Sequence, residues 1–248
     1  MTHTPKKETD LQRGSQIIRD YVANLPSTPG VYRMFSDKGE VLYVGKAKAL
    51  KKRVGRYTHV DKLPIRLQRM VALTATMEFV NTHTEVEALL LESNLIKKLK
   101  PRYNILLRDD KSFPYILITG DHEYAQVKKH RGARKGSKAK GGGEYFGPFA
   151  SAGAVNQSIH VLQRVFKLRN CSDSIFSSRE RPCLQYHIKR CTAPCVDKVS
   201  REEYAEQVEQ ARQFLSGESR LIQEKFAREM QAASETEEFE KAAEYRDR

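Results

Sequence analysis

The stretch of residues 29–57 constrains the fold of this chain more than any other. Two runs of β-branched and aromatic residues, 31–35 and 41–44, flank a polar turn that contains Gly39. Short apolar runs joined by such a turn are typical of an antiparallel hairpin. We therefore predict two paired strands in this part of the chain.

Polar side chains follow one another closely on this hairpin and on the basic segment 47–57 after it. The segment has a helical composition, and its apolar residues recur at a spacing that places them on one face. Two tyrosines occupy similar places on the two strands, each beside a glycine. The apolar face consists of Leu50, Val54 and Tyr57, and the polar candidates are Tyr32, Tyr43, Lys46, Arg53 and Tyr57.

These residues resemble a known family. Residues 30–32 (Gly-Val-Tyr) and 43–45 (Tyr-Val-Gly) resemble the paired motifs of the GIY-YIG nucleases, with valine in place of isoleucine in both. Pro29, residues 45–48 and the Arg-Tyr pair at 56–57 look most like the UvrC family, which supplies the incision subunit of bacterial nucleotide excision repair. The resemblance continues from about Leu25 through nearly the whole chain. It is strengthened by residues 85–98, 101–104, 181–195 and 239–247.

Composition narrows the class of protein. The 248 residues suffice for one to three domains with a real core, and no apolar run approaches the length of a membrane span. The amino terminus has no apolar segment of the signal-peptide type, so we expect a cytoplasmic protein without a membrane partner. The formal net charge of +13 favours a polyanionic partner such as nucleic acid, the alternative being a merely solvated basic surface.

Further elements predict an α+β domain around the hairpin. Residues 75–82 alternate as a third strand, and residues 63–73 form an amphipathic helix. A longer helix begins at Thr84 as N-cap, with Glu87 at the capping-box position, and Pro101 ends it. We therefore expect a three-stranded antiparallel sheet flanked by helices.

The remaining chain divides by composition. Strands are predicted at 113–119 and 124–127, followed by the basic, glycine-rich segment 128–143, which we interpret as a loop. The predicted parts are a disordered or partly helical tail at 1–20, the GIY-YIG domain at 21–105, a small α/β extension at 106–168, a cysteine-rich segment at 169–199 and a helical segment at 200–248.

The basic loop is the predicted DNA contact. Residues 128–140 hold seven Lys or Arg and no acid, a charge that a linker does not need. A harmless linker is the alternative. The candidates for phosphate contact are Lys128, Lys129, Arg131, Arg134 and Lys135.

The first domain contains the groups that cleavage of a phosphodiester requires. Glu92 can hold one Mg²⁺ or Mn²⁺, since such an ion keeps most of its waters. Arg53 suits a phosphate, and Tyr43 is our candidate general base, with Lys46 expected to depress its pKa. Tyr32 and Tyr57 can donate hydrogen bonds to phosphate oxygens.

The resemblance implies the same site. It assigns the second motif's tyrosine to Tyr43, the helix arginine to Arg53 and the metal ligand to Glu92. It also implies supporting roles for Lys46, Tyr57 and Asn104. The alternative is that the tyrosines are packed strand residues and Glu92 is a solvated helix residue. Glu87 is the rival metal ligand, and we assign it to the helix cap.

Four clustered cysteines predict a metal site, because disulfides are rare in the cytoplasm. Their spacing lacks the paired knuckles of common zinc ribbons and suits an iron–sulfur cluster at least as well. Zinc and four free thiols are the alternatives, and the resemblance implies a 4Fe–4S cluster. The candidate ligands are Cys171, Cys183, Cys191 and Cys195.

Two polar helices are predicted after Ser200, with a break near Gly217 and the second helix continuing to Arg248. Residues 239–247 resemble the UVR motif, a helical hairpin that pairs with the like motif of UvrB. Small residues permit close approach of helices, and aromatic residues provide anchors. The chain stops within the motif, so we expect an incomplete hairpin. The candidate contacts are Phe239, Ala242, Ala243 and Tyr245.

The resemblance implies a metal-dependent endonuclease that makes the 3′ incision beside a lesion in duplex DNA bound to UvrB, with UvrA acting upstream. Two alternatives remain open. One is another kind of GIY-YIG nuclease, and the other is a non-catalytic DNA-binding scaffold that carries a metal cluster.

Overall fold

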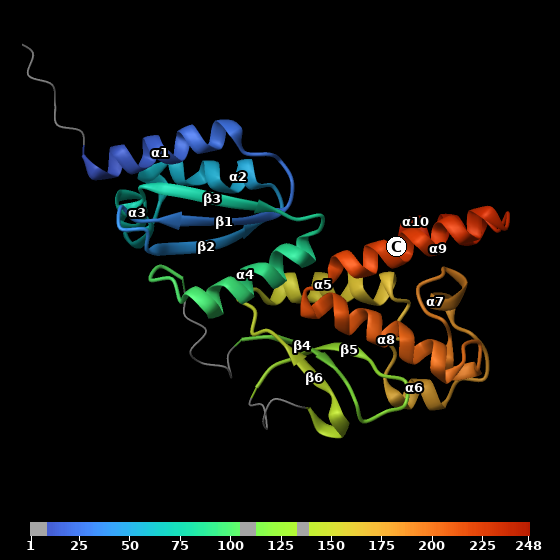
Figure 1. Ribbon diagram of the computed structural model, residues 1–248. Helices are drawn as coiled ribbons and strands as arrows, with labels where there is room; N and C mark the ends of the chain where they lie inside the picture. The colour runs from blue at the N-terminus through green and yellow to red at the C-terminus, as the bar shows by residue number, and fades with distance from the viewer. Residues whose placement is uncertain (1–8, 105–112, 133–138) are drawn as a thin grey trace, which may run out of the picture. The chain divides into compact units, whose positions relative to one another are not determined.

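The computed structural model describes residues 9–104, 113–132 and 139–248 (Figure 1). The chain divides into two units, Met1–Arg108 and Asp109–Arg248. No helix in the described ranges is long and apolar enough to cross a membrane. The fold class predicted from the sequence, α+β with a three-stranded antiparallel sheet, is confirmed.

The sheet of the first unit contains β1 (Gly30–Phe35), β2 (Val41–Ala47) and β3 (Thr76–Asn81) in the order β2-β1-β3, all antiparallel. Gly39 has φ +76° in the turn between β1 and β2, a backbone conformation that glycine adopts without strain. The register pairs Met34 with Tyr43 and Phe35 with Val41, which leaves Leu42 as an extra residue in β2. This bulge sets which face Tyr43 occupies.

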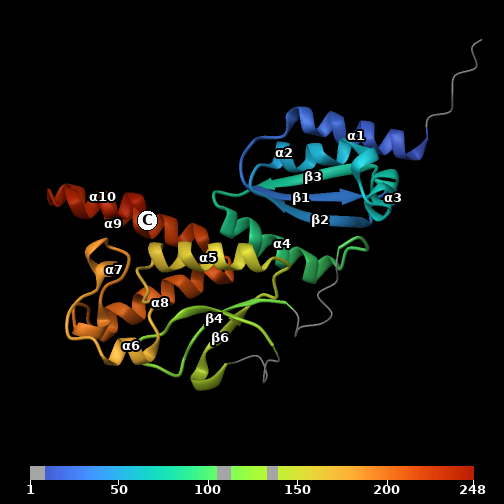
Figure 2. The same ribbon diagram turned by 180° about the vertical axis from the view of Figure 1, so that it is seen from behind.

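Helices cover both faces of this sheet. α1 (Asp10–Asn24), α2 (Leu50–Val54) and α3 (Ile65–Leu73) lie on one side, and α4 (Glu85–Leu99) lies on the other (Figures 1 and 2). The first side packs around Tyr32 and Met34, and the α4 side packs around Val31 and Val44. Alternation along each strand places these two sets on opposite faces.

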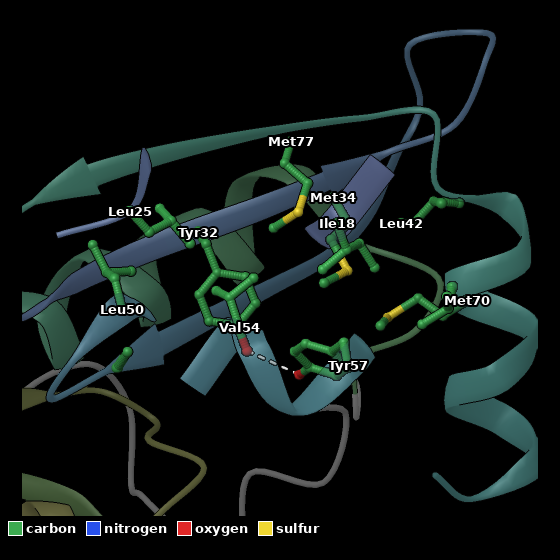
Figure 3. Packing of buried hydrophobic residues seen from close by; sticks show 12 residues of the cluster. Ile18, Leu25, Tyr32, Met34, Leu42, Leu50, Val54, Tyr57, Met70 and Met77 are labelled. Carbon is green, nitrogen blue, oxygen red and sulfur yellow. Dashed lines mark hydrogen bonds between the residues drawn. The ribbon is translucent and has the colours of Figure 1, made fainter. Parts of the chain in front are cut away.

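The helix predicted at 47–57 is shorter than expected. α2 ends at Val54 and continues as the 3₁₀ helix η1 (Gly55–Thr58), with η2 (Val60–Lys62) after it. The predicted apolar face is confirmed, because Leu50, Val54 and Tyr57 are all buried in the same cluster (Figure 3).

The segment expected as a tail contributes to the core. α1 begins with a capping box formed by Thr9 and Gln12, and Ile18 on it is fully buried. A Cβ on Gly14 would lie 1.8 Å from the carbonyl oxygen of Val71, so glycine permits α1 and α3 to approach closely. Helical order here therefore comes from tertiary packing.

The predicted cap of α4 is confirmed. Thr84 accepts a hydrogen bond from the backbone N–H of Glu87 at 3.2 Å, and the Glu87 carboxylate accepts one from the backbone N–H of His83 at 3.0 Å. The Thr84 cap is therefore present as predicted, whereas Glu87 bonds the residue before the N-cap and not the backbone of Thr84, as a capping box would require. The helix ends at Lys100, whose φ of +46° turns the chain into Pro101.

The second unit contains another antiparallel sheet, made of β4 (Tyr115–Ile118), β5 (Val127–His130) and β6 (Glu144–Phe146) in the order β5-β4-β6. The interpretation of 128–143 as a loop is wrong at its start. Lys128 and Lys129 lie in β5 and pair with β4. An edge strand accommodates lysines because their side chains reach water and discourage pairing with another chain. The 3₁₀ helix η3 (Lys140–Gly142) precedes β6.

Helices form the rest of this unit. They are α5 (Ala152–Val165), α6 (Asp173–Ser177), α7 (Leu184–His187), the 3₁₀ helix η4 (Pro194–Val196), α8 (Arg201–Ser216), α9 (Ser219–Glu235) and α10 (Phe239–Asp247).

The predicted break at Gly217 is confirmed, with φ +102° between α8 and α9. The prediction that one helix runs from there to Arg248 is wrong, because the chain turns again at residues 236–238, where Glu237 has φ +59°. α10 then packs back along α9 (Figures 1 and 2). The described residues therefore contain two packed helical arms, α9 and α10, where we expected one continuous helix.

Candidate active site

Three tyrosines from three elements meet on the face of the sheet that α1, α2 and α3 cover. The ring centroids of Tyr32, Tyr43 and Tyr57 lie 6.0–6.3 Å apart. The hydroxyls of Tyr32 and Tyr57 share a hydrogen bond of 2.9 Å, drawn as a dashed line in Figure 3. Tyr32 and Tyr57 are buried, whereas Tyr43 is half-buried. The cluster therefore opens to solvent through Tyr43.

Gly45 makes room for this cluster. It lies opposite Tyr32 in the strand register, and a Cβ there would come within 2.5 Å of Cζ and Oη of Tyr32 and 2.7 Å of Cε1 of Tyr43. The cluster therefore requires a residue without a side chain at position 45, which explains the glycine that follows Tyr43 in the second sequence motif.

Gly45→Ala is expected to lower stability by about 1–3 kcal/mol, because the ring of Tyr32 must move. Displaced phenols should also lower the rate of any reaction at this site by about 100-fold. Thermal melting and a strand-cleavage assay measure the two effects. Gly55→Ala is the control, since its Cβ would make only an ordinary 3.8 Å contact with Val22. Equal melting temperatures for the two variants would contradict this steric role.

Burial controls the protonation of the phenols. It raises the pKa of Tyr43 above its usual value of 10, and the neighbouring Tyr57 raises it further. We expected Lys46 to depress this pKa, and the structure contradicts that. Lys46 lies opposite Val31, on the other face of β2 from Tyr43, which lies opposite Met34. An odd separation along a strand places two side chains on opposite faces.

Arg53 is the cation of the phenol cluster. It lies on α2, one turn before Tyr57, and its charge lowers the pKa of both Tyr32 and Tyr43, although by less than burial raises them. The phenols in turn raise the pKa of Arg53, so its guanidinium stays charged. The solvent-exposed position of Arg53 leaves it accessible to an anionic ligand.

Glu92 approaches the same site from α4. Its carboxylate accepts a hydrogen bond of 2.8 Å from the backbone N–H of Lys46. Burial raises the pKa of Glu92, while the Lys46 N–H and the charges of Lys46 and Arg53 oppose that shift. The charge of Glu92 also raises the pKa of Tyr43, with a smaller effect than burial.

Asn104 holds β2 in place. Its side-chain oxygen accepts from the backbone N–H of Val44 and its amide donates to the carbonyl of Val44, both at 2.8 Å. The backbone N–H of Tyr103 donates to the carbonyl of Leu42. With the bond from Lys46 to Glu92, these contacts satisfy the outer edge of β2. Asn104 thus positions the strand that carries Tyr43.

The donor set at Glu92 fits one hard cation. In the described ranges, no group of three or more His, Cys, Asp or Glu side chains could hold a metal ion together. A single fixed carboxylate is nevertheless enough for Mg²⁺, which retains several waters. Asn104 is engaged with the backbone of Val44, and one carboxylate oxygen of Glu87 is engaged with the backbone of His83.

The four cysteines are free and lie in one region of the second unit. Burial, with smaller contributions from the charges of the other three thiols, raises the pKa of Cys191 to about 11. Their sulfurs do not form a coordination shell for one ion in the described part of the chain. Four neighbouring thiols have the chemistry of a cluster ligand set.

The candidate DNA contacts divide between strand and loop. Lys128 and Lys129 on β5, and Arg131 just after it, are exposed. Arg134 and Lys135 lie outside the described residues.

The candidate partner contacts on α10 do not share one surface. Phe239, which is 66% exposed, lines one groove together with Ala242, Ala243 and Met230 of α9. Tyr245 instead packs on Phe226 of α9, with ring centroids 6.2 Å apart. Within this hairpin, Tyr245 therefore faces the partner arm.

Sequence reasoning missed Arg169, a fully buried cation before the first cysteine. Its guanidinium donates to the carbonyls of Tyr124 and Cys171 and to the carboxylate of Asp173, at 2.6, 3.2 and 2.6 Å. It also lies over the ring of Phe176 at 4.8 Å. A buried arginine has no signature in a single sequence, because its burial depends on contacts with distant segments such as the one that carries Tyr124.

Comparison with known families assigns most of the chain. A model of the UvrC-like GIY-YIG domain matches residues 28–105, and a model of the UvrC/Cho excinuclease middle domain matches residues 113–214. A model of the UvrB/uvrC motif, UVR, matches residues 222–248, which cover most of α9 and all of α10.

Relatives and solved structures include the following. UvrABC system protein C of Paramagnetospirillum magneticum is 62% identical over 248 residues, which are 100% of this chain and 39% of that protein. The protein of the same name from Rhodospirillum rubrum is 58% identical over 95% of this chain and 36% of its own length. The crystal structure of the magnesium-bound GIY-YIG N-terminal endonuclease domain of UvrC from Thermotoga maritima is 36% identical, covering 36% of this chain and 96% of that one, with a TM-score of 0.32.

The chain thus spans little more than a third of the curated relatives that it matches. The three family models match successive ranges of this chain, 28–105, 113–214 and 222–248. The sequence identity to the two relatives is above 50%. The chain belongs to the UvrC family.

Proposed function

We propose that this chain is a metal-dependent endonuclease of nucleotide excision repair, which hydrolyses one phosphodiester bond on the 3′ side of a lesion in duplex DNA. The observation that carries the proposal is the placement of Tyr43 on β2, of the Glu92 carboxylate against the backbone of Lys46 on the same strand, and of Arg53 on α2, the helix that follows this strand. An open phenol, a permanent cation and a fixed carboxylate are the groups that hydrolysis of a phosphodiester needs. The position of the cut rests on membership of the family.

The residues have separate roles in this reaction. Arg53 binds the non-bridging oxygens of the scissile phosphate, where negative charge increases in the transition state. Tyr43 accepts a hydrogen bond from the attacking water, and in its ionised form, the phenolate, it accepts the proton of that water. Tyr57 is hydrogen-bonded to Tyr32, packs against the ring of Tyr43 and so orients the Tyr43 phenol. The charge of Arg53 opposes the effect of burial on the pKa of Tyr43. Lys46 and Asn104 hold Glu92 and β2 in place through backbone bonds.

Glu92 is the proposed ligand of Mg²⁺ or Mn²⁺. When bound there, the cation supplies positive charge for the leaving oxygen and for ionisation of Tyr43. The hydrogen bond from Lys46 fixes the orientation of the carboxylate before any ligand binds.

The second unit supplies the proposed partners. The exposed Lys128, Lys129 and Arg131 contact DNA phosphates, and the α9–α10 hairpin binds the UVR motif of UvrB, which UvrA has loaded at the lesion. The four cysteines hold a 4Fe–4S cluster, with zinc as the alternative. Measurement of iron, acid-labile sulfide and zinc in the purified protein distinguishes the 4Fe–4S cluster from a zinc site. We expect the protein to act in the cytoplasm, where bacterial DNA is repaired.

A lesion-bearing duplex, labelled at one end and preloaded with UvrA and UvrB in Mg²⁺, tests the proposal. We expect one nick on the 3′ side that requires the lesion, and a rate lower by about 10²–10³ for Arg53→Gln. Nicking that ignores the lesion would indicate a general GIY-YIG nuclease. Binding of DNA without any nick would indicate a non-catalytic scaffold.

A further inference from the structure

A groove of 580 Å³ lies on the second unit, and its lining includes Asn170 and Arg190, the sequence neighbours of Cys171 and Cys191. One wall is α5, and the other comes from residues 168–170 and from the turn after α7. The side chains that matter here are Gln157, His160, Arg164, Asn170, Gln185 and Arg190.

The helical wall has one polar face by sequence. Gln157, His160 and Arg164 recur at i, i+3 and i+7 on α5 and are exposed. The opposite face carries Val155 and Leu162, which are buried. Residues with this spacing lie one above the other on a helix, so they form a continuous stripe along the groove.

The charge of the groove has a single sign. Its lining contains two arginines, a histidine and several amides, and no Asp or Glu. The other large cavity of the unit, of 680 Å³, contains Glu203, Glu206, Glu229 and Glu244 among its lysines. The mixed charge there is already internally compensated.

The two arginines also lack carboxylate partners. Within the described ranges, no salt bridge joins Arg164 or Arg190 to an acid, whereas Arg212 and Arg220 of the same unit each pair with glutamates. Unpaired guanidiniums beside neutral hydrogen-bond donors are suited to phosphate oxygens.

We propose that this groove binds the sugar–phosphate backbone of duplex DNA. The cations are exposed along an open groove rather than enclosed around one small anion, which suits a polymer with repeated phosphates. Exposed glutamine and asparagine side chains add donors of the kind that position DNA without reading its sequence. DNA as the ligand rests on the proposed function, but the groove itself is a second contact that the cleavage site does not include.

The double variant Arg164→Gln/Arg190→Gln tests the groove. Fluorescence anisotropy with a labelled duplex, without added divalent cation, measures binding by the whole chain over a series of salt concentrations. We expect about 10-fold weaker binding near 0.1 M salt and a slope of log K against log salt that is lower by about 2. The control Arg220→Gln/Arg228→Gln on α9 removes the same charge from outside the groove and should change affinity less than about 2-fold. Thermal melting confirms that both variants fold.

Equal losses in the groove variant and the control would overturn the inference, because net charge alone would then explain them. Equal salt slopes for the groove variant and the unmodified chain would overturn it as well. The test is independent of cleavage. A groove variant that loses DNA affinity when the unmodified chain makes no nick would support the groove and refute the nuclease. If the groove variant binds DNA as tightly as the unmodified chain, and the unmodified chain makes the lesion-dependent nick, the groove inference is refuted and the nuclease proposal is supported.

Discussion

Glu92→Gln is expected to lower the rate of incision by about three orders of magnitude while leaving the melting temperature unchanged or higher. Loss of the only charged ligand proposed for the cation removes several kcal/mol of transition-state stabilisation, and about 4 kcal/mol corresponds to 10³ in rate. The glutamine oxygen can still accept the hydrogen bond that Lys46 donates to Glu92. Single-turnover incision and thermal melting measure the two effects.

The pH dependence follows from the raised pKa of Glu92. Because folding raises this pKa, the folded state holds the proton more tightly than the unfolded state does. Ionisation of Glu92 therefore lowers the stability of the folded state. This loss of stability is absent below the pKa of Glu92 in the unfolded chain, and it is complete once the pH has risen through the pKa of Glu92 in the folded chain. Glu92→Gln should remove this dependence. The cation needs the ionised form, so incision should decline with acid at a higher pH than an ordinary glutamate would give.

Glu87→Gln is the matched control on the same helix. Glu87 accepts a hydrogen bond from the backbone N–H of His83 at the start of α4, and a glutamine there retains an acceptor. We expect near-normal incision from this variant. Substantial incision by Glu92→Gln, or equal losses in both variants, would remove Glu92 from the metal site.

Arg169→Met is expected to destabilise the second unit by about 3–5 kcal/mol, because it removes a buried guanidinium that donates to the carbonyl of Tyr124 and to the carboxylate of Asp173. The carbonyl of Cys171 would keep only its bond from the side chain of Gln126. For a unit of this size, the melting temperature should fall by roughly 10–20 °C. Since Arg169 bonds the carbonyl of Cys171, the cysteine region should also exchange its amide hydrogens faster. Calorimetry and hydrogen exchange measure these effects.

The same substitution should change the response of the unit to acid. Arg169 holds the pKa of Asp173 below its usual value, so this pair stabilises the fold above the unfolded pKa and loses that effect as pH falls through the folded pKa. In Arg169→Met this acid-dependent loss should disappear. Arg212→Met is the control, because Arg212 pairs with Glu144 and Glu209 at the surface and should contribute less than about 1 kcal/mol. A similar melting temperature for both variants would contradict a structural role for Arg169.

Local patterns were sufficient for most of the first unit. The hairpin, the third strand and the cap at Thr84 follow from alternation, a glycine turn and an N-cap threonine, all of which act over a few residues. The Lys128–Lys129 strand was not predictable in this way, because its charge resembles that of a loop and its order comes from pairing with β4. The turn at Glu237 has no glycine or proline to mark it.

The sequence by itself determined the family, the residue types of the site and their order along the chain. Only the tertiary structure decided which of these groups meet. It placed Lys46 on the face of β2 away from Tyr43, engaged Asn104 with the backbone of Val44, and brought Glu92 from α4 to the strand edge. It also buried Arg169 among carbonyls from separate segments. The physical reason is that burial and pairing depend on contacts between residues far apart in the chain, which a local pattern does not encode.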